Sequence, residues 1–183
     1  MSTTTTPVIG QVLNEQNQSH ETRKKITAQL EKELGRKVIS LFTSFRYPVV
    51  LSDDDADMVE AVLQTMDLSN GIALLLSSPG GSGLAAERII KILRNYSGTG
   101  DYWVIIPGKA KSAATMVSFG ASKIFMGPAS ELGPIDPQLT IIEDGRPKRF
   151  SLCNIVDSYK DLFLRATDEK HNLQPYLQQL ARY

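Results

Sequence analysis

An apolar run, IALLL at residues 72–76, ends in the polar turn SSPGGS at residues 77–82. A second run, WVII at residues 103–106, ends in the same way and leads into GKAKSAA at residues 108–114. Each pattern predicts a buried strand that breaks into a turn and opens a helix, a geometry that points backbone N–H groups outward and can stabilise an oxyanion. Because Ser112 lies on the second turn, acyl chemistry is the first function to consider.

Strands and helices are predicted to alternate along the chain. The strands are expected at residues 38–43, 72–77, 102–106 and 123–126, and the helices at residues 52–66, 84–96, 111–120 and 150–164. This order predicts a mostly parallel sheet with right-handed crossovers. The stretch at residues 127–138 is rich in Pro and Gly, so an ordered loop is expected there.

The chain is expected to have a short polar arm before its folded part. Residues 1–20 offer few apolar side chains and are expected to be disordered, whereas residues 21–35 form an amphipathic pattern with Ile26, Leu30 and Leu34 on one face. Residues 36–183 are then one domain of ordinary size. The sequence leaves open whether the natural chain continues past Tyr183.

Composition excludes some partners. Lys plus Arg total 20 and Asp plus Glu total 20, so no net field favours nucleic acid or anionic lipid. A single cysteine, Cys153, fits a reducing compartment and a cytoplasmic location. No stretch approaches the roughly 20 apolar residues of a membrane span. Membrane association is therefore expected only through a partner or through an anchor missing from this chain.

The two turns hold the candidate catalytic groups. Gly80 and Gly81 lack a Cβ, which lets a substrate approach the backbone while an N–H donates to it, and the Ala113 N–H lies beside any oxyanion formed at Ser112. The alternative is that the glycines only turn the chain and that Ser112 only caps a helix. Neither turn matches a phosphate loop or a dinucleotide fingerprint, so no nucleotide cofactor is expected.

No metal site is expected. The three acidic residues at positions 53–55 stand at consecutive helical positions, which face different directions, and no His or Glu lies near them in the sequence. Helix capping and first-turn charge are the expected roles of this acidic run.

A nucleophilic serine needs a base, and histidine is a poor candidate. The sequence holds only His20 and His171, each in a polar context away from a strand end, so a Ser-His-Asp triad is not expected. A lysine can serve if burial keeps its amine neutral. We favour Lys148, on the segment that follows the Pro-Gly loop, over Lys109, Lys111, Lys123 and Lys160.

Three motifs together resemble a known family. They are SPGGS at 78–82, GKAKSAAT at 108–115 and LGPIDPQ at 132–138. In this order they resemble the Clp-type and signal-peptide-peptidase-A branch of the ClpP/crotonase superfamily, above all the serine dehydrogenase proteinases. The resemblance implies a stacked ββα superhelix, homo-oligomers, and ATP-independent peptide hydrolysis without metal or cofactor.

Carried over by position, the resemblance gives roles to individual residues. Ser112 matches the nucleophile, and Gly80, Gly81 and Ala113 match the oxyanion hole. Where the Clp protease has its histidine, this chain has PIDP at residues 134–137, so that triad is not carried over. The segment RPKRF at residues 146–150 loosely resembles the region where related enzymes have a catalytic lysine, which supports Lys148.

Three functions are compatible with these residues. The leading one is a serine endopeptidase with a Ser112–Lys148 dyad, acting on a peptide or protein substrate. The second is an interaction scaffold that kept the fold and lost turnover, which the missing histidine favours. The third is a crotonase-like acyl-CoA enzyme, for which Glu131 and Asp136 are the available loop carboxylates.

Overall fold

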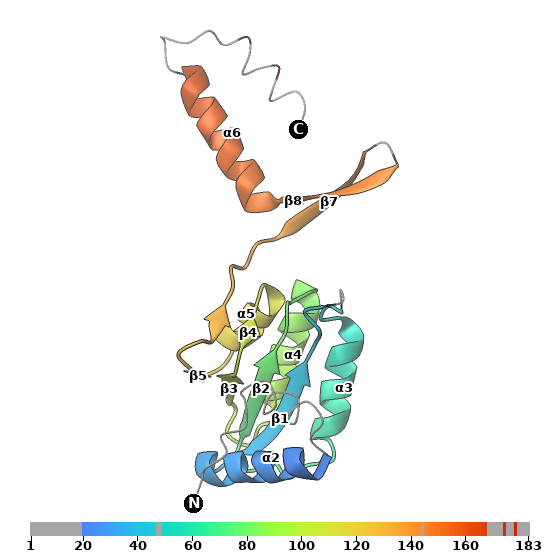
Figure 1. Ribbon diagram of the computed structural model, residues 1–183, viewed down its shortest axis with the longest axis vertical. Helices are drawn as coiled ribbons and strands as arrows, with labels where there is room; N and C mark the ends of the chain where they lie inside the picture. The colour runs from blue at the N-terminus through green and yellow to red at the C-terminus, as the bar shows by residue number, and fades with distance from the viewer. Residues whose placement is uncertain (1–19, 47–48, 144, 168–173, 175–177, 179–183) are drawn as a thin grey trace, which may run out of the picture. The chain divides into compact units, whose positions relative to one another are not determined.

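The computed structural model describes residues 20–46, 49–143, 145–167, 174 and 178. The expected polar arm therefore lies outside the described residues, except for His20. Internal contacts divide the chain into two compact units, Met1–Pro134 and Ile135–Tyr183 (Figure 1). The boundary between them falls within the stretch expected to be a loop.

The first unit is built on a four-stranded parallel sheet, as the sequence predicts. Its strands are β1 (Lys37–Phe42), β2 (Ile72–Ser77), β3 (Tyr102–Ile106) and β5 (Lys123–Met126), in the order β1-β2-β3-β5. Four residues of β2 are fully buried, because helices cover a parallel sheet on its faces. The strands begin and end within one residue of the bounds expected from the sequence, which confirms them.

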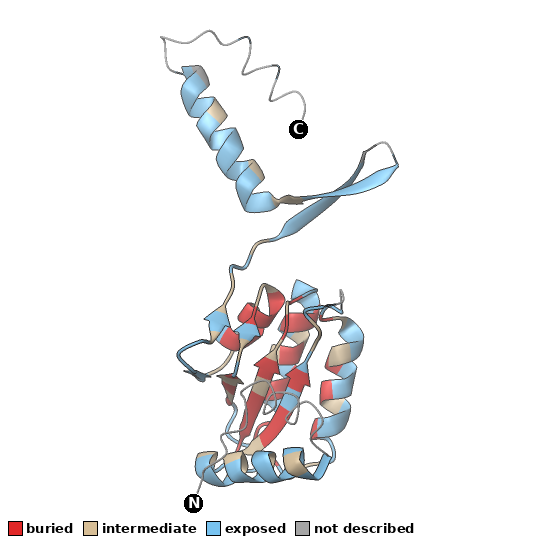
Figure 2. Cartoon of the chain, viewed as in Figure 1, coloured by how far each residue is buried: buried red, intermediate tan, exposed pale blue. Residues whose placement is uncertain are grey.

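Four helices in the described part of the first unit accompany this sheet. They are α2 (His20–Leu34), α3 (Asp53–Leu63), α4 (Gly83–Tyr96) and α5 (Ala113–Phe119). The expected start of α3 is confirmed, since the Ser52 N–H donates to Asp55 Oδ2 over 2.8 Å. Ile89 and Leu93 of α4 and Val117 of α5 join the same core as the strands. Figure 2 shows this core as the buried residues of the strands and of the helix faces that meet them.

A second, smaller sheet follows the main one. Its strands are β4 (Lys109–Ala110) and β6 (Glu131–Leu132), which pair in parallel, and Ser78 forms an isolated bridge with Ala110. Strand β3 thus leads into β4 and then into α5, a ββα sequence of the kind that the family resemblance implies. Strand β6 lies in the stretch that was expected to be loop alone.

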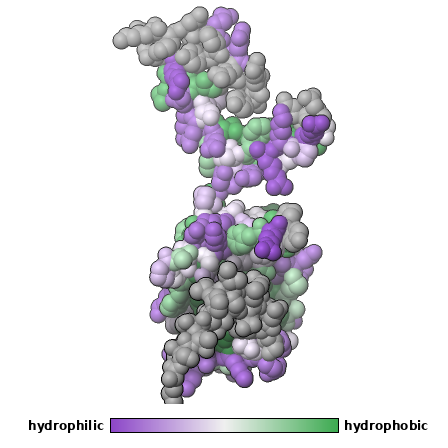
Figure 3. All heavy atoms as spheres, in the orientation of Figure 1, coloured by the Kyte–Doolittle hydropathy of each residue, from purple (hydrophilic) through white to green (hydrophobic). Residues whose placement is uncertain are grey.

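The second unit contains a hairpin and a helix. Strand β7 (Gln138–Glu143) pairs antiparallel with β8 (Arg146–Ser151), and helix α6 (Leu152–Thr167) follows. The helix was predicted but the hairpin was not. Most of the described residues of the unit are exposed (Figure 2), among them Val156 and Phe163 of α6. Hydrophobic residues also show on the surface of this unit in Figure 3. No helix in the described part of the chain has the length and apolar character needed to span a membrane.

Candidate active site

The two turns singled out in the sequence are hydrogen-bonded to each other. The Ser78 N–H donates to the Lys109 carbonyl over 3.0 Å, and the Lys111 N–H donates to the Ser78 carbonyl over 3.0 Å. These bonds pair the end of β2 with β4, which leads directly into the turn at Ser112. The sheet therefore brings the Pro-Gly-Gly turn and the serine turn together.

Gly80 lies against the serine turn. A Cβ added at Gly80 would stand 2.5 Å from the Lys111 carbonyl oxygen, 2.8 Å from Ser112 Cβ and 2.9 Å from the Ala113 nitrogen. Its φ is +97°, a backbone conformation that residues with a side chain rarely adopt. Both observations explain why glycine occupies this position, and they show how closely the predicted site residues approach one another.

Gly81 is fixed by a different neighbour. The Gly80 carbonyl accepts from the Leu51 N–H over 2.8 Å, and the Ser82 N–H donates to the Leu51 carbonyl over 2.8 Å. A Cβ on Gly81 would lie 2.3 Å from that carbonyl oxygen, so no larger residue fits here without a shift of the backbone. The turn is thus held from both sides, by residue 51 and by the segment before Ser112.

Ser112 has a strained backbone. Its φ of 49° and ψ of −119° make it the one residue other than glycine with positive φ in the described part of the chain. Such a conformation costs about 1–3 kcal/mol and clusters at functional sites, where the surrounding structure enforces it. Ser112 directly precedes α5 but makes no side-chain cap hydrogen bond. The simple capping role weighed in the sequence analysis is therefore not what this hydroxyl does.

The three backbone amides expected to hold an oxyanion differ in their hydrogen bonds. The Gly80 N–H donates to Ser78 Oγ over 3.0 Å and is buried. For the Gly81 and Ala113 N–H groups, no acceptor is found among the described residues. The Ala113 N–H is the first of helix α5 and so has no partner within the helix. These two amides are the ones available to an incoming acyl oxygen.

Two of the candidate lysines lie beside the serine turn and are paired. Glu131 Oε2 stands 2.8 Å from Lys111 Nζ, and its other oxygen stands 3.5 Å from Lys109 Nζ. The hydrogen bond from Lys111, helped by the charge of Lys109, lowers the pKa of Glu131 below its usual value. An ion pair favours the charged form of both partners, whereas a lysine acting as base has to be uncharged.

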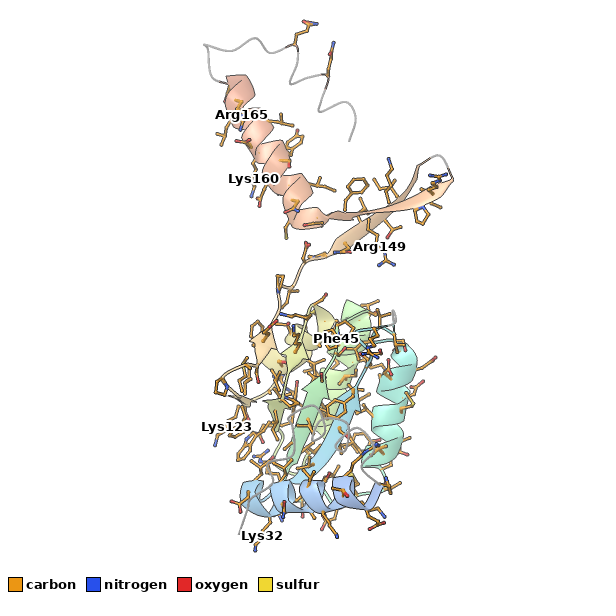
Figure 4. The ribbon with its side chains drawn as sticks, viewed as in Figure 1. Lys32, Phe45, Lys123, Arg149, Lys160 and Arg165 are labelled. Carbon is orange, nitrogen blue, oxygen red and sulfur yellow. The ribbon has the colours of Figure 1, made fainter. Side chains whose placement is uncertain are left out.

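The remaining candidate lysines are dispersed. Lys148 lies on β8 of the second unit, opposite Ile141 of β7, and its side chain is exposed. Lys160 extends from α6 of the same unit (Figure 4) and stands 3.8 Å from Asp157. Lys123 of β5 stacks over the Trp103 ring at 4.3 Å. The pairing of Ser112 with Lys148 stays a prediction.

The acidic residues considered for other chemistry are also engaged. Asp53 of α3 pairs with Arg88 of α4, and Asp55 accepts the hydrogen bond from the Ser52 N–H. Asp136 accepts a hydrogen bond from Ser151 Oγ over 2.9 Å. The described residues contain no group of three or more His, Cys, Asp or Glu side chains that could hold a metal ion.

Sequence reasoning missed two buried hydroxyls at the site. Ser78 is fully buried and accepts from the Gly80 N–H and from Thr43 Oγ1, the latter over 2.7 Å. Thr115 of α5 is almost fully buried, with its Oγ1 2.9 Å from the Ala110 carbonyl and 3.0 Å from the Gly133 carbonyl. For Thr115 the available signal was its place between the apolar Ala114 and Met116, since a buried hydroxyl needs a partner. Ser78, between Ser77 and Pro79, had no such signal.

The chain belongs to the family of ClpP-like SDH-type serine proteinases, whose model matches residues 10–145. It is 34% identical over 101 residues to uncharacterized protein MJ0137 of Methanocaldococcus jannaschii, covering 55% of this chain and 34% of that protein. It is 27% identical over 156 residues to uncharacterized protein MJ1495 of the same organism, covering 80% of this chain and 50% of that one. The chain thus spans a third to a half of the length of these relatives.

Two solved structures of one protease are similar to the chain. One is a serine-to-alanine mutant of the 1510-N membrane-bound stomatin-specific protease, with a TM-score of 0.47 and 16% identity, covering 76% of this chain and 65% of that one. The other is a lysine-to-alanine mutant of the same protease in complex with a substrate peptide, with a TM-score of 0.47 and 18% identity, covering 76% of this chain and 61% of that one.

Proposed function

We propose that the chain is a serine endopeptidase whose nucleophile is Ser112. The observation that carries the proposal is the strained serine turn, packed against a Gly-Gly turn, with two backbone N–H groups that have no acceptor among the described residues. Membership of a serine proteinase family supports peptide bonds as the substrate.

The proposed reaction follows the usual course of acyl transfer. Ser112 Oγ attacks the peptide carbonyl and gives its proton to a neutral lysine amine, while the Gly81 and Ala113 N–H groups hold the oxyanion. The intermediate collapses to an acyl-enzyme, and the lysine returns the proton to the leaving amine. The same lysine then takes a proton from water, which attacks the acyl carbon, and gives that proton to Ser112 Oγ as the acyl–oxygen bond breaks.

Lys148 is proposed as this base. Lys109 and Lys111 already share the carboxylate of Glu131. A base lysine must also lose its proton before catalysis.

Hydrolysis of a fluorogenic peptide library by lysine variants tests this assignment. Lys148→Ala and Lys148→Arg should both lose at least about 100-fold in kcat, because a guanidinium does not give up its proton. Lys160→Ala, in the same unit, is the matched control and should keep its activity. If Lys111→Ala abolishes turnover and Lys148→Arg retains it, the base is Lys111 and the proposed dyad is wrong.

Assembly and location are further parts of the proposal. Strand β5 is an edge strand of the sheet, and its Ile124, Phe125 and Met126 are all exposed, which supports a homo-oligomer that covers apolar surface. A cytoplasmic location is proposed from the single cysteine. Native mass spectrometry should find a multimer of the 20.2 kDa chain, and a monomer at micromolar concentration would contradict assembly.

Hydrolysis also distinguishes the alternatives. A purified protein that assembles but cleaves no peptide would be the scaffold that kept the fold without turnover. A crotonase-like enzyme requires free carboxylates near a thioester, whereas Glu131 and Asp136 are bonded to neighbouring side chains. Thermal stabilisation by acyl-CoA, absent with peptides, would favour that enzyme over the peptidase.

A further inference from the structure

We propose that Ser78 is a positioning residue that holds the Gly80 N–H inward, so that the Gly81 N–H, together with that of Ala113, binds the oxyanion. This inference rests on the peptidase function proposed above. It assigns to Ser78, which never touches the substrate, the task of selecting which of two adjacent amides faces the reacting oxygen.

The first support is the way in which the Ser78 hydroxyl is used. Its side chain is fully buried, and Oγ accepts from the Gly80 N–H over 3.0 Å and from Thr43 Oγ1 over 2.7 Å. A hydroxyl oxygen has two acceptor lone pairs, and both are occupied here. The hydrogen bond from Thr43 fixes the position of the Ser78 hydroxyl. The Gly80 N–H, which donates to the same oxygen, is therefore held in one direction.

The second support is the backbone of the same residue. Its N–H and its carbonyl bond to Lys109 and Lys111, on the two sides of Ala110, and Ser112 comes directly after Lys111. One residue therefore fixes the oxyanion turn through its side chain and the nucleophile turn through its backbone. A change in the hydroxyl alters the first turn while leaving the bonds to the second intact.

The third support is the contrast between the two glycines. Gly80 is buried and its N–H is satisfied inside the protein, whereas Gly81 is exposed and its N–H has no acceptor among the described residues. Adjacent N–H groups of an irregular turn point in different directions. Fixing one of them therefore fixes the direction of the other.

Loss of the Ser78 hydroxyl should consequently affect the transition state more than substrate binding. In Ser78→Ala the buried Gly80 N–H loses its acceptor, and the turn reorients to satisfy it. The Gly81 N–H then no longer points to the developing oxyanion, a contact that strengthens only as charge forms. Removal of one oxyanion donor lowers kcat by about 100- to 1,000-fold, and we expect a loss of at least about tenfold in Ser78→Ala.

Steady-state kinetics of three variants tests this expectation. Ser78→Ala should lower kcat at least about tenfold with KM within about twofold, and Thr43→Val, which is close in shape but lacks the hydroxyl, should lower kcat by a smaller factor. Thr43→Ser, which keeps the hydroxyl, should have the kcat of the wild type. Ser118→Ala is the matched control, since Ser118 is equally buried and its hydroxyl donates to the Ala114 carbonyl within α5.

Amide hydrogen exchange, followed by NMR with glycine labelling, gives a readout besides activity. In the free wild type the Gly80 amide should be protected and the Gly81 amide should exchange rapidly. After phosphonylation of Ser112, a stable mimic of the intermediate, the Gly81 amide should become protected. In the free Ser78→Ala protein the Gly80 amide should lose its protection. Amide exchange therefore tests the positioning role of Ser78 even if this variant is inactive.

The outcomes separate this inference from the function on which it rests. A wild type that neither hydrolyses peptides nor reacts with the phosphonate overturns both. An active wild type with an equally active Ser78→Ala overturns the positioning role alone. Protection of Gly80 rather than Gly81 on phosphonylation also overturns it, and if Ser78→Ala fails to fold, the Thr43→Val and Thr43→Ser pair decides in its place.

Discussion

Substitution of Gly80 by alanine should be among the most damaging single-methyl changes in the first unit. The new Cβ would lie 2.5 Å from the Lys111 carbonyl oxygen and 2.9 Å from the Ala113 nitrogen, both backbone atoms that cannot rotate away. Overpacking costs about 1–3 kcal/mol, and the positive φ of 97° adds about 1–2 kcal/mol for a residue with a side chain. The expected loss of unfolding free energy is therefore about 2–5 kcal/mol.

Two further glycines separate these contributions. Gly100 has a φ of +70° but nothing within 4 Å of an added Cβ, so Gly100→Ala should show the conformational cost alone, about 1 kcal/mol after the gain from a less flexible unfolded chain. Gly108 has open space and no positive φ, so its alanine variant should lie within about 0.5 kcal/mol of wild type. Urea unfolding measures all three. A Gly80→Ala protein no less stable than Gly100→Ala would refute the close approach of the two turns.

Three other predictions concern buried or paired polar groups. Hydrogen bonds from Ser122 and Thr99, together with Arg36, lower the pKa of Asp101 to about 2 from an ordinary 3.8. The contribution of the charged Asp101 to the free energy of unfolding is therefore present above pH 4 and is lost as the pH falls toward 2. Asp101→Asn should be less stable than wild type at pH 7 in thermal melts and should lose less between pH 4 and 2. Thr115→Val should lose about 1–3 kcal/mol in urea unfolding, because the Ala110 and Gly133 carbonyls keep their positions through this hydroxyl. Burial raises the pKa of Tyr102, whose hydroxyl donates to the Val117 carbonyl, so alkaline absorbance titration should find a resistant tyrosine in the wild type that is missing from Tyr102→Phe.

Much of the fold of the first unit could be predicted from the sequence, because its buried strands require apolar residues. The run at residues 72–76 is apolar on both faces and ends in Pro-Gly-Gly, so a parallel central strand and its turn could both be predicted. The position of Ser112 at the start of a helix followed from the same kind of pattern. Its strained backbone did not, because serine has no preference for positive φ, and the surrounding bonds impose it.

Other features depend on contacts that a single sequence does not reveal. The hydrogen bonds of Ser78 to Lys109 and Lys111 required two turns to meet in space, so Ser78 was interpreted only as part of a turn. The hairpin of β7 and β8 did have a local signal, the pair Asp144-Gly145 between two alternating segments. It was missed because Pro147 and three basic residues in β8 are unusual in a strand. The base could not be chosen from spacing alone, since five lysines were compatible with it.

The proposed mechanism depends on the reactivity of the Ser112 hydroxyl, and a covalent probe measures that reactivity most directly. Wild-type protein should be incubated with a fluorophosphonate, digested, and analysed by tandem mass spectrometry beside Ser112→Ala and Ser118→Ala. We expect a single phosphonyl group on Ser112 in the wild type and in Ser118→Ala, and none in Ser112→Ala. An adduct on another residue, or equal labelling of Ser112→Ala, would contradict the claim that the strained serine turn is the reaction centre.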